Sequence, residues 1–576
     1  MKYLLPLVPS IAVFGLLTLV PDSGRAASNT WDGGGANGNW STPGNWVGDT
    51  NIPGVADNGV TTTNTDTATF FQPLGTSPIV IDAGGRNLQN ITFDTNTNVA
   101  FVIGTVGGTN ALLLTNGGAI TNKTSTSTSN AQTINAPIVI QGNGGSYTFD
   151  QQDGGTGAAI TFNGPISGVS TSGNTTTLTL TASNNGVSII NGKVSDGSGG
   201  GKLSISSTGN SGTWRLTGSN DYTGGTTIST GNILVGNNSA LGTGTVTFSG
   251  ANAGTLGVTG ATAITLANNI NLQHSGGSGS GNISSAASTA ALTLSGTITN
   301  VGGGSRVVTL SNTNGTTLSG NILLSDNSNA GTLNFQPAAN TTATISGVIS
   351  NGTAASGAIT KSATGTLVLT GSNTYTGATT ISAGTLLING NNSSATGAVA
   401  VNTGGTLGGN GTIGGAVTVA NSTTAILAPG TLLDSTETLT LNNKDLTFSG
   451  VDSQLKIDIT GTSAGSFDRI VGVNSLTANG DITFTLSGTY GTASWDVLDF
   501  TSKTGNFDTI TLAGSYSGSL LRSGDTWTGT VGGQAWTFEQ TTGVLSVVPE
   551  PTTWALLAAS ATFLVVTARR RRGLLR

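Results

Sequence analysis

Short runs of alternating apolar and polar residues recur along most of the chain. They include TLTLT at 177–181, KLSIS at 202–206, TLVLT at 366–370 and TLTL at 438–441. Leu or Ile occupies every second position of these runs, which is the period of a half-buried strand. Turn-forming Gly and Asn lie between the runs, and no amphipathic helical pattern of useful length interrupts them. The pattern predicts an all-β chain with many short strands.

Two longer units indicate how these strands are organised. GTWRLTGSNDYTGGTTISTGNILV at 212–235 aligns without a gap to GTLVLTGSNTYTGATTISAGTLLI at 365–388, with 16 of 24 positions identical. Each unit is too short to bury its own apolar face, so it must stack on neighbouring units, as in a solenoid. The two copies lie 153 residues apart, which fits about seven coils of about 22 residues each.

Matching positions of the two units are expected to have matching structural roles. We expect Gly218 and Gly224 to form corners, Ile228 to face the core and Tyr222 to pack over a turn. The corresponding residues of the second unit are Gly371, Gly377, Ile381 and Tyr375.

The pattern of short alternating runs separated by turn residues continues from 85 to 450, and we assign this segment to a parallel β-helix. Parallel strands stack about 4.8 Å apart, so coils of roughly 20–25 residues would give about 15–18 coils in this segment. A series of β-sandwiches stays open as an alternative fold, and so does a low-complexity stalk rich in Ser and Thr.

Composition supports the stacked arrangement. Charged residues are only 8% of the 576 residues, against about 25% in ordinary globular proteins. Stacking places like side chains in line, where like charges would repel one another. The chain has no Cys, so disulfides, thiolate chemistry and zinc sites with Cys ligands are excluded.

The charge balance bears on possible partners. Residues 27–548 hold 12 basic and 23 acidic residues, a balance of −11. Nucleic-acid binding depends on a basic patch that neutralises phosphates. We therefore expect no nucleic-acid partner.

The N-terminus has the layout of a secretory signal peptide. A short basic region at Lys2 precedes an apolar run over 3–20, and small residues Gly24 and Ala26 precede a predicted cut before Ala27. A retained membrane anchor is the alternative.

The C-terminus carries a second candidate targeting segment. Val548 begins the motif VPEP, an apolar run follows over 554–568, and four arginines come next. This run is short for a membrane span of about 20 residues, and the arginines would stay on the cytoplasmic side. A plain C-terminal membrane anchor is one interpretation of this layout.

Two segments that flank the repeats differ from them in composition. Trp31, Trp40 and Trp46 lie among Gly, Asn and Pro near the N-terminus; they could stack on sugars, but we favour a cap over the open end of the array. After about 450, aromatic and charged residues become denser, which suggests a small antiparallel β cap. The predicted segments are a signal peptide over 1–26, a Trp-rich cap over 27–84, a β-helix over 85–450, a C-terminal β cap over 451–547 and a sorting signal over 548–576.

Candidate chemistry is sparse. The single histidine, His274, lies in a Gly/Ser-rich stretch, where we read it as a solvated loop residue and not as part of a catalytic triad. Asp150 and Asp153 are close in sequence and are the best candidates for the paired carboxylates of a glycoside hydrolase. They lie at a predicted turn, so we interpret them as turn residues. We expect no catalytic residue, no metal site and no cofactor.

The C-terminal layout resembles the PEP-CTERM sorting signal of Gram-negative bacteria. That resemblance implies recognition by an exosortase, removal of the tail during export, and association with exopolysaccharide and biofilm matrix. The residues it implicates are Pro549, Glu550, Pro551, Arg569, Arg570, Arg571 and Arg572.

The two repeat units are similar to the autotransporter-associated β-strand repeat, G-T-L-x-L-x-G-x-N-x-Y-x-G-x-T-x-I. This resemblance implies a right-handed parallel β-helix of the passenger type. It covers the repeats alone, because we see no sequence for a C-terminal translocator.

The sequence thus predicts an exported, noncatalytic, adhesin-like protein of the cell surface, outer membrane or extracellular matrix. The partners expected are the secretion machinery, an exosortase and exopolysaccharide, with transient anchoring in the inner membrane by the C-terminal helix. A β-helix polysaccharide lyase or glycoside hydrolase is the alternative.

Overall fold

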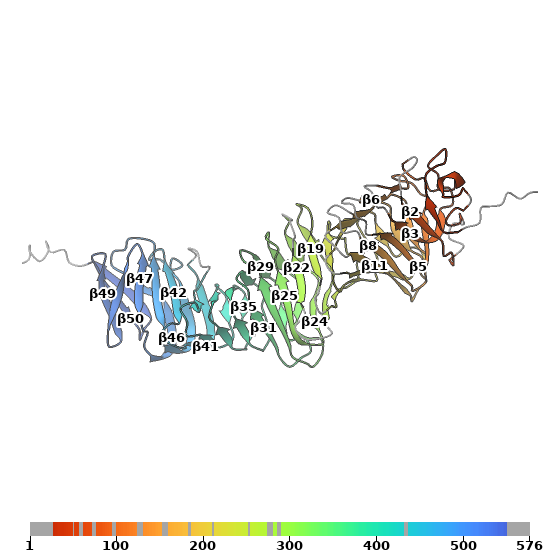
Figure 1. The fold of residues 1–576 in the computed structure, drawn as a ribbon. Coiled ribbons are helices and arrows are strands. Elements are labelled where there is room, and N and C mark those ends of the chain that lie inside the picture. Colours follow the sequence, from red (N-terminus) through yellow and green to blue (C-terminus); the bar gives the residue numbers. More distant parts are fainter. Residues whose placement is uncertain are drawn as a thin grey trace, which may run out of the picture.

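The structure is a computed structural model that describes most of the chain between residues 27 and 549. The described ranges are 27–49, 51–56, 62–71, 77–94, 100–123, 131–152, 159–182, 186–209, 212–250, 254–273, 280–284, 290–430 and 436–549. Figure 1 shows an elongated body with the two ends of the described chain at opposite ends.

Three stacked sheets form a parallel β-solenoid of about 15 turns. The first sheet contains β1 (Asn29–Trp31), β2 (Thr67–Phe70), β3 (Arg86–Phe93), β5 (Leu112–Asn122), β7 (Ile138–Ile140), β8 (Ser146–Gln151), β10 (Ile166–Gly168), β11 (Thr175–Ala182), β13 (Val194–Ser195), β14 (Lys202–Thr208), β16 (Thr226–Ile228), β18 (Val246–Phe248), β21 (Ile270–Gln273), β24 (Ile298–Val301), β27 (Ile322–Leu323) and β30 (Ile349–Ser350).

The second sheet runs along most of the body. It contains β4 (Val102–Ile103), β6 (Ala131–Ile134), β9 (Ala159–Phe162), β12 (Val187–Ile190), β15 (Thr213–Leu216), β17 (Asn232–Val235), β19 (Thr255–Val258), β22 (Ser280–Ser284), β25 (Gly304–Leu310), β28 (Gly331–Pro337), β31 (Gly357–Lys361), β33 (Thr379–Ile381), β35 (Asn391–Asn392), β36 (Val399–Val401), β38 (Thr412–Ile413), β39 (Val417–Val419), β41 (Thr438–Phe448), β43 (Arg469–Ala478) and β46 (Leu498–Gly505).

The third sheet begins near the middle of the chain. It contains β20 (Ile264–Leu266), β23 (Leu292–Leu294), β26 (Thr316–Leu318), β29 (Thr342–Ile345), β32 (Thr366–Leu369), β34 (Gly384–Ile388), β37 (Gly405–Gly408), β40 (Ile426–Leu427), β42 (Gln454–Ile459), β44 (Asp481–Leu486), β45 (Ala493–Asp496), β47 (Ile510–Gly514), β48 (Gly518–Ser523), β49 (Thr526–Val531), β50 (Gln534–Glu539) and β51 (Val544–Pro549).

The alternating pattern places side chains as expected. Leu178 of β11 is in register with Tyr147 of β8 and Ile205 of β14, and all three are buried. Thr177, on the outer side of β11, lies with its hydroxyl 3.0 Å from that of Ser204 in the next coil. The strands from β2 to β44 pair in parallel with their neighbours in adjacent coils. The predicted all-β solenoid is confirmed, and the parallel pairing excludes the alternative series of antiparallel β-sandwiches.

The two repeat units lie on different faces of this solenoid. In the first unit, β15, β16 and β17 belong to the second, first and second sheets, whereas β32, β33 and β34 of the second unit belong to the third, second and third sheets. Along the second sheet, six successive pairings lead from β15 to β31, and β32 is the next strand of the chain. The second copy therefore begins six coils and one strand after the first, and it lies on the next sheet of the solenoid. The expected spacing of about seven coils is too large.

Aromatic side chains fill the N-terminal end. Trp31, Trp40 and Trp46 are all buried, and each lies with its ring centroid 5.6–6.1 Å from that of Phe70 in β2. The indole of Trp40 donates a hydrogen bond to the Pro53 carbonyl over 2.9 Å. These rings cover the end of the core and offer no exposed face to a sugar.

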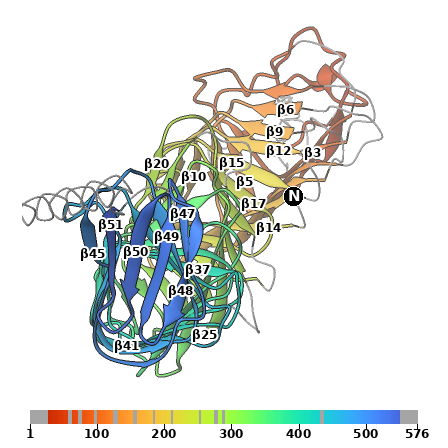
Figure 2. The same cartoon turned by 90° about the vertical axis from the view of Figure 1, so that its left-hand side faces the viewer.

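Parallel coils continue beyond residue 450. β42, β44 and β47 pair in parallel. β48 then pairs antiparallel with β47, and β49, β50, β51 and β45 continue the sheet with antiparallel pairings. Figure 2 shows these antiparallel strands lying across the end of the coils. The segment expected to be a separate β cap over 451–547 thus contains solenoid coils in its first part and antiparallel strands in its last.

Candidate functional site

In each repeat unit, the side chain of one Asn makes a hydrogen bond to the preceding coil that a backbone group of a strand would otherwise make. Asn220 Oδ1 accepts a hydrogen bond from the backbone N–H of Val194 over 2.7 Å, and its Nδ2 donates to the Ala240 carbonyl. Asn373 Oδ1 likewise accepts from the backbone N–H of Ile349 over 2.8 Å. Each Asn is buried and links the coil before it to the coil after it.

The repeat glycines permit close approach between coils. A Cβ on Gly218 would lie 2.3 Å from the Gly192 carbonyl oxygen, and one on Gly371 would lie 2.3 Å from that of Gly347. Gly224 and Gly377 are equally confined, with a carbonyl oxygen of the preceding coil at 2.4 Å. The contact distance, and not a left-handed backbone, requires Gly at these positions.

The repeat tyrosines lie in the core. Tyr222 and Tyr375 are 0% and 1% exposed, and each hydroxyl lies 2.6 Å from a Thr hydroxyl four residues later. Burial raises the pKa of Tyr375 to about 12 and also raises the pKa of Tyr222. Ile228 and Ile381 are also fully buried, as expected for residues that face the core. The two tyrosines therefore pack inside the coils and present almost no exposed surface.

An amide ladder follows the outer corner of four consecutive coils. Asn163 donates to Asn135 over 2.8 Å, Asn191 donates to Asn163 over 2.9 Å, and Thr217 donates to Asn191 over 2.5 Å. Asn163 and Asn191 are exposed. An amide has two donors and two acceptor lone pairs, so these side chains keep hydrogen-bonding capacity for a ligand.

The acids of the coils take part in structural hydrogen bonds. Asp150 accepts from Thr181 of the next coil over 2.6 Å. Asp196 accepts from the backbone N–H of Leu203 and, one coil further on, from both the N–H and the hydroxyl of Thr223. Asp153 and His274 lie outside the described residues. Within the described ranges, no three His, Cys, Asp or Glu side chains gather in a way that could hold a metal ion.

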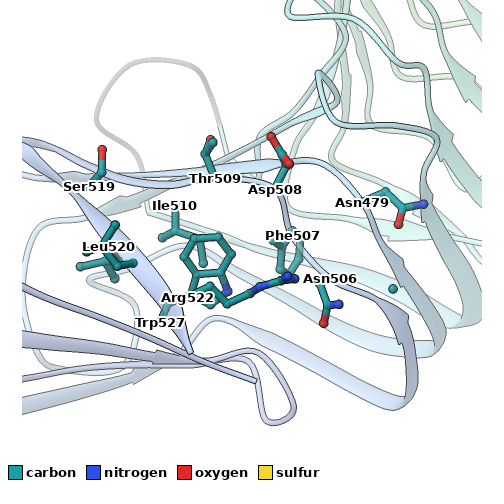
Figure 3. A pocket seen from close by; sticks show the side chains of 12 residues that line it. Asn479, Asn506, Phe507, Asp508, Thr509, Ile510, Ser519, Leu520, Arg522 and Trp527 are labelled. Atoms are coloured by element: carbon teal, nitrogen blue, oxygen red, sulfur yellow. The ribbon is translucent and has the colours of Figure 1, made fainter. Parts of the chain in front are cut away.

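A groove of about 670 Å³ opens near the C-terminal strands (Figure 3). Its floor is apolar and includes Phe507, Ile510, Leu520 and Trp527, all buried. The polar residues that line it are Asn479, Asn506, Asp508, Thr509, Ser519 and Arg522. An apolar floor with a few polar groups above it is typical of small-ligand sites.

Lys361 and Asp468 are ionisable side chains with almost no exposed surface, and both lie away from the groove. Lys361 is 0% exposed, and its Nζ donates to the carbonyl oxygens of Ser362, Ala363 and Ala383 over 2.7–3.2 Å. Desolvation lowers the pKa of Lys361 to about 8. Asp468 is 1% exposed, and desolvation raises its pKa to about 7.

The predicted export signals are mostly outside the described residues. Ala26 lies there, as do Glu550, Pro551 and the four arginines, whereas Ala27 begins the described chain and Pro549 ends β51. Among the described helices, none has the length and apolar character needed to cross a membrane. The predicted C-terminal helix is not among them.

Comparison with known families agrees with the repeat geometry. The family Passenger-associated-transport-repeat matches residues 208–235 and 359–388, the two segments that contain Asn220 and Asn373. No match is found among curated proteins. The passenger repeat together with the parallel solenoid indicates an exported, surface-displayed protein of the passenger type.

The sequence analysis did not predict the groove. It also did not predict the glycines that lie above one another at one corner of successive coils. Gly164, Gly192, Gly320 and Gly347 are each followed two residues later by Ile or Val, and a Cβ on any of them would lie 1.9–2.2 Å from a carbonyl oxygen one coil earlier. This short Gly-x-Ile/Val motif marks the corner of these four coils. The groove residues carry no comparable motif, because they come from separate coils and a hairpin.

Proposed function

We propose that this protein is a noncatalytic surface rod that contacts exopolysaccharide through its outer face. The ladder of Asn135, Asn163, Asn191 and Thr217 carries the proposal, because it places a hydrogen-bonding side chain at the same corner of four consecutive coils. Several weak contacts made together give useful avidity without a deep site. The balance of −11 over residues 27–548 favours hydrogen bonding over charge attraction to acidic chains.

Engagement of the coil acids in structural bonds supports a noncatalytic role. Glycosidases need two carboxylates free to act on one glycosidic bond, whereas Asp150 and Asp196 are held by hydroxyl and backbone donors of adjacent coils. The residues that would have to act with Asp150 in the alternative enzyme hypothesis include Asp153, outside the described part of the chain.

The export route is part of the proposal. We infer a right-handed course for the coils, because crossover connections between parallel strands are right-handed in the great majority of sheets. A signal peptide ending at Ala26 would direct export. An exosortase would then recognise Pro549, Glu550 and Pro551 while the apolar helix and the Arg569–Arg572 cluster hold the chain in the inner membrane. Release of the tail would leave the rod at the surface or in the biofilm matrix.

Incubation of the purified protein with neutral and acidic polysaccharides tests this function. We expect sedimentation with at least one polymer and no new reducing ends or unsaturated products. A double variant, Asn163→Ala with Asn191→Ala, should weaken sedimentation, whereas Asn402→Ala, an exposed Asn on another coil, should not. Product formation would contradict the noncatalytic role, and loss of all binding to every polymer would contradict the polysaccharide partner.

A further inference from the structure

We propose that the groove near the C-terminal strands is a discrete binding site for a neutral, hydroxyl-rich oligosaccharide. The proposal rests on the proposed function in that both assume a protein that meets polysaccharide outside the cell. It adds a single localised site, distinct from the amide ladder of the rod face.

The groove is lined by one carboxylate and one guanidinium that are not paired with an opposite charge among the described residues. Asp508 and Arg522 are both exposed and both line it, and neither takes part in any ion pair found within the described ranges. Figure 3 shows Arg522 beside Trp527 with its guanidinium toward Asn506, while Asp508 lies apart from it. Neighbouring sugar hydroxyls can donate to a carboxylate and accept from a guanidinium at the same time.

Amides extend this hydrogen-bonding set. Asn479 and Asn506 also line the groove, and with its oxygen toward Arg522 the Asn506 amide accepts from that guanidinium over 3.1 Å. Amide side chains offer both donors and acceptors, as sugar hydroxyls require. The bond to Asn506 also holds Arg522 in place before a ligand arrives.

The apolar part of the groove suits the C–H face of a sugar ring. Trp527 and Leu520 are 4% and 2% exposed and form the floor, whereas Leu521 at the rim is 76% exposed. The Nε1–H of Trp527 has no hydrogen-bond partner although it is buried. A ligand oxygen that reached this donor would remove an unfavourable buried polar group.

The local charge selects a neutral chain over an acidic one. Besides Asp508, the acidic Asp525 and Asp481 lie close by, bound to Gln540 and Thr509 respectively. The cations nearby are Arg522 and Lys503, and Lys503 already lies 3.9 Å from Asp525. A polyuronate would meet more negative than positive charge here, so we assign a neutral saccharide.

Titration calorimetry of the full chain with neutral and uronate-containing tetra- to hexasaccharides tests the assignment. We expect at least one neutral oligosaccharide to bind. Asp508→Asn and Ser519→Phe should each weaken that binding roughly tenfold or more, the first by removing a charged acceptor and the second by filling the groove. Thermal unfolding checks that each variant folds.

Matched controls lie outside the groove. Asp452→Asn removes another exposed carboxylate, and Ser494→Phe adds the same ring at an exposed strand position, so neither should change the affinity. Binding confined to uronate chains, or neutral binding that both groove variants leave unchanged, would overturn the assignment. Polymer sedimentation that persists in such a result would leave the proposed function standing, because that contact is made along the rod face.

Discussion

The side-chain oxygen of Asn373 accepts a hydrogen bond from the backbone N–H of Ile349, one coil earlier, over 2.8 Å. The next residue along, Thr374, donates its own N–H to the Ile349 carbonyl over 2.9 Å. Asn220 and Asp221 make the same pair of bonds to Val194. The Asn side chain thus satisfies the backbone N–H of the strand residue, and the following peptide N–H satisfies its carbonyl. Both groups are paired at a corner where no further strand lies alongside.

We predict that Asn373→Ala destabilises the protein by about 1–3 kcal/mol, because the buried N–H of Ile349 would lose its partner. Denaturant unfolding measures the loss, and amide hydrogen exchange of Ile349 localises it. Asn402→Ala, at an exposed position, is the control and should have little effect. Unchanged exchange at Ile349 would show that the side chain does not substitute for a strand.

We expect Gly371→Ala to destabilise the solenoid as well. Its new Cβ would lie 2.3 Å from the Gly347 carbonyl oxygen, and backbone atoms cannot move aside as a flexible side chain can. Overpacking of this kind costs about 1–3 kcal/mol. Gly491→Ala is the matched control, since a Cβ there meets nothing within 4 Å. Equal unfolding midpoints for the two variants would rule out the close approach between coils.

Much of the fold could be predicted from the sequence, but the placement of the faces could not. Alternation in runs such as TLVLT at 366–370 specifies which side of a strand is buried, and Leu367 and Leu369 are buried accordingly. It does not specify which of three sheets the strand joins. The two repeat units therefore share a sequence and a local geometry while lying on different sheets, and the third sheet, which holds two strands of the second unit, begins only at β20, after the first unit.

The candidate site shows the same limit. Asn220 and Tyr222 are conspicuous in sequence, yet their roles depend on contacts with Val194 and Thr226 that only the folded coil defines. Asp508 and Arg522 have no local pattern at all, because one follows a parallel coil and the other lies in a hairpin of the antiparallel strands. Their shared groove is a property of the tertiary structure.

Lys361 gives a pH-dependent prediction. Its pKa in the folded protein is lowered to about 8, whereas the unfolded chain should titrate near 10.5. The unfolded state therefore binds more protons between these values, so this group makes the free energy of unfolding rise with pH from about 8 to about 10.5. Below pH 8 the penalty of a buried ammonium is present in full.

Lys361→Met should remove this rise of the free energy of unfolding with pH, because no titratable group would remain at the position. Unfolding midpoints measured from pH 7 to pH 10.5 test it, with Lys202→Met, at an exposed position, as the control. An identical pH slope in Lys361→Met and the unsubstituted protein would contradict the lowered pKa.

Processing of the tail is a separate prediction. If an exosortase acts at the motif, the exported protein should end near Pro549–Pro551. Mass spectrometry of protein released from the cell surface determines this end directly. Recovery of peptides that contain Arg569 or Arg576 from that material would count against removal of the tail.

Surface display of the rod is the central claim, and the absence of Cys from the chain allows a direct test. A single Lys202→Cys substitution places one thiol at an exposed position of β14. Intact producing cells and lysed cells are then treated with a membrane-impermeant maleimide. We predict that the protein is labelled as fully on intact cells as after lysis; labelling only after lysis would contradict the account.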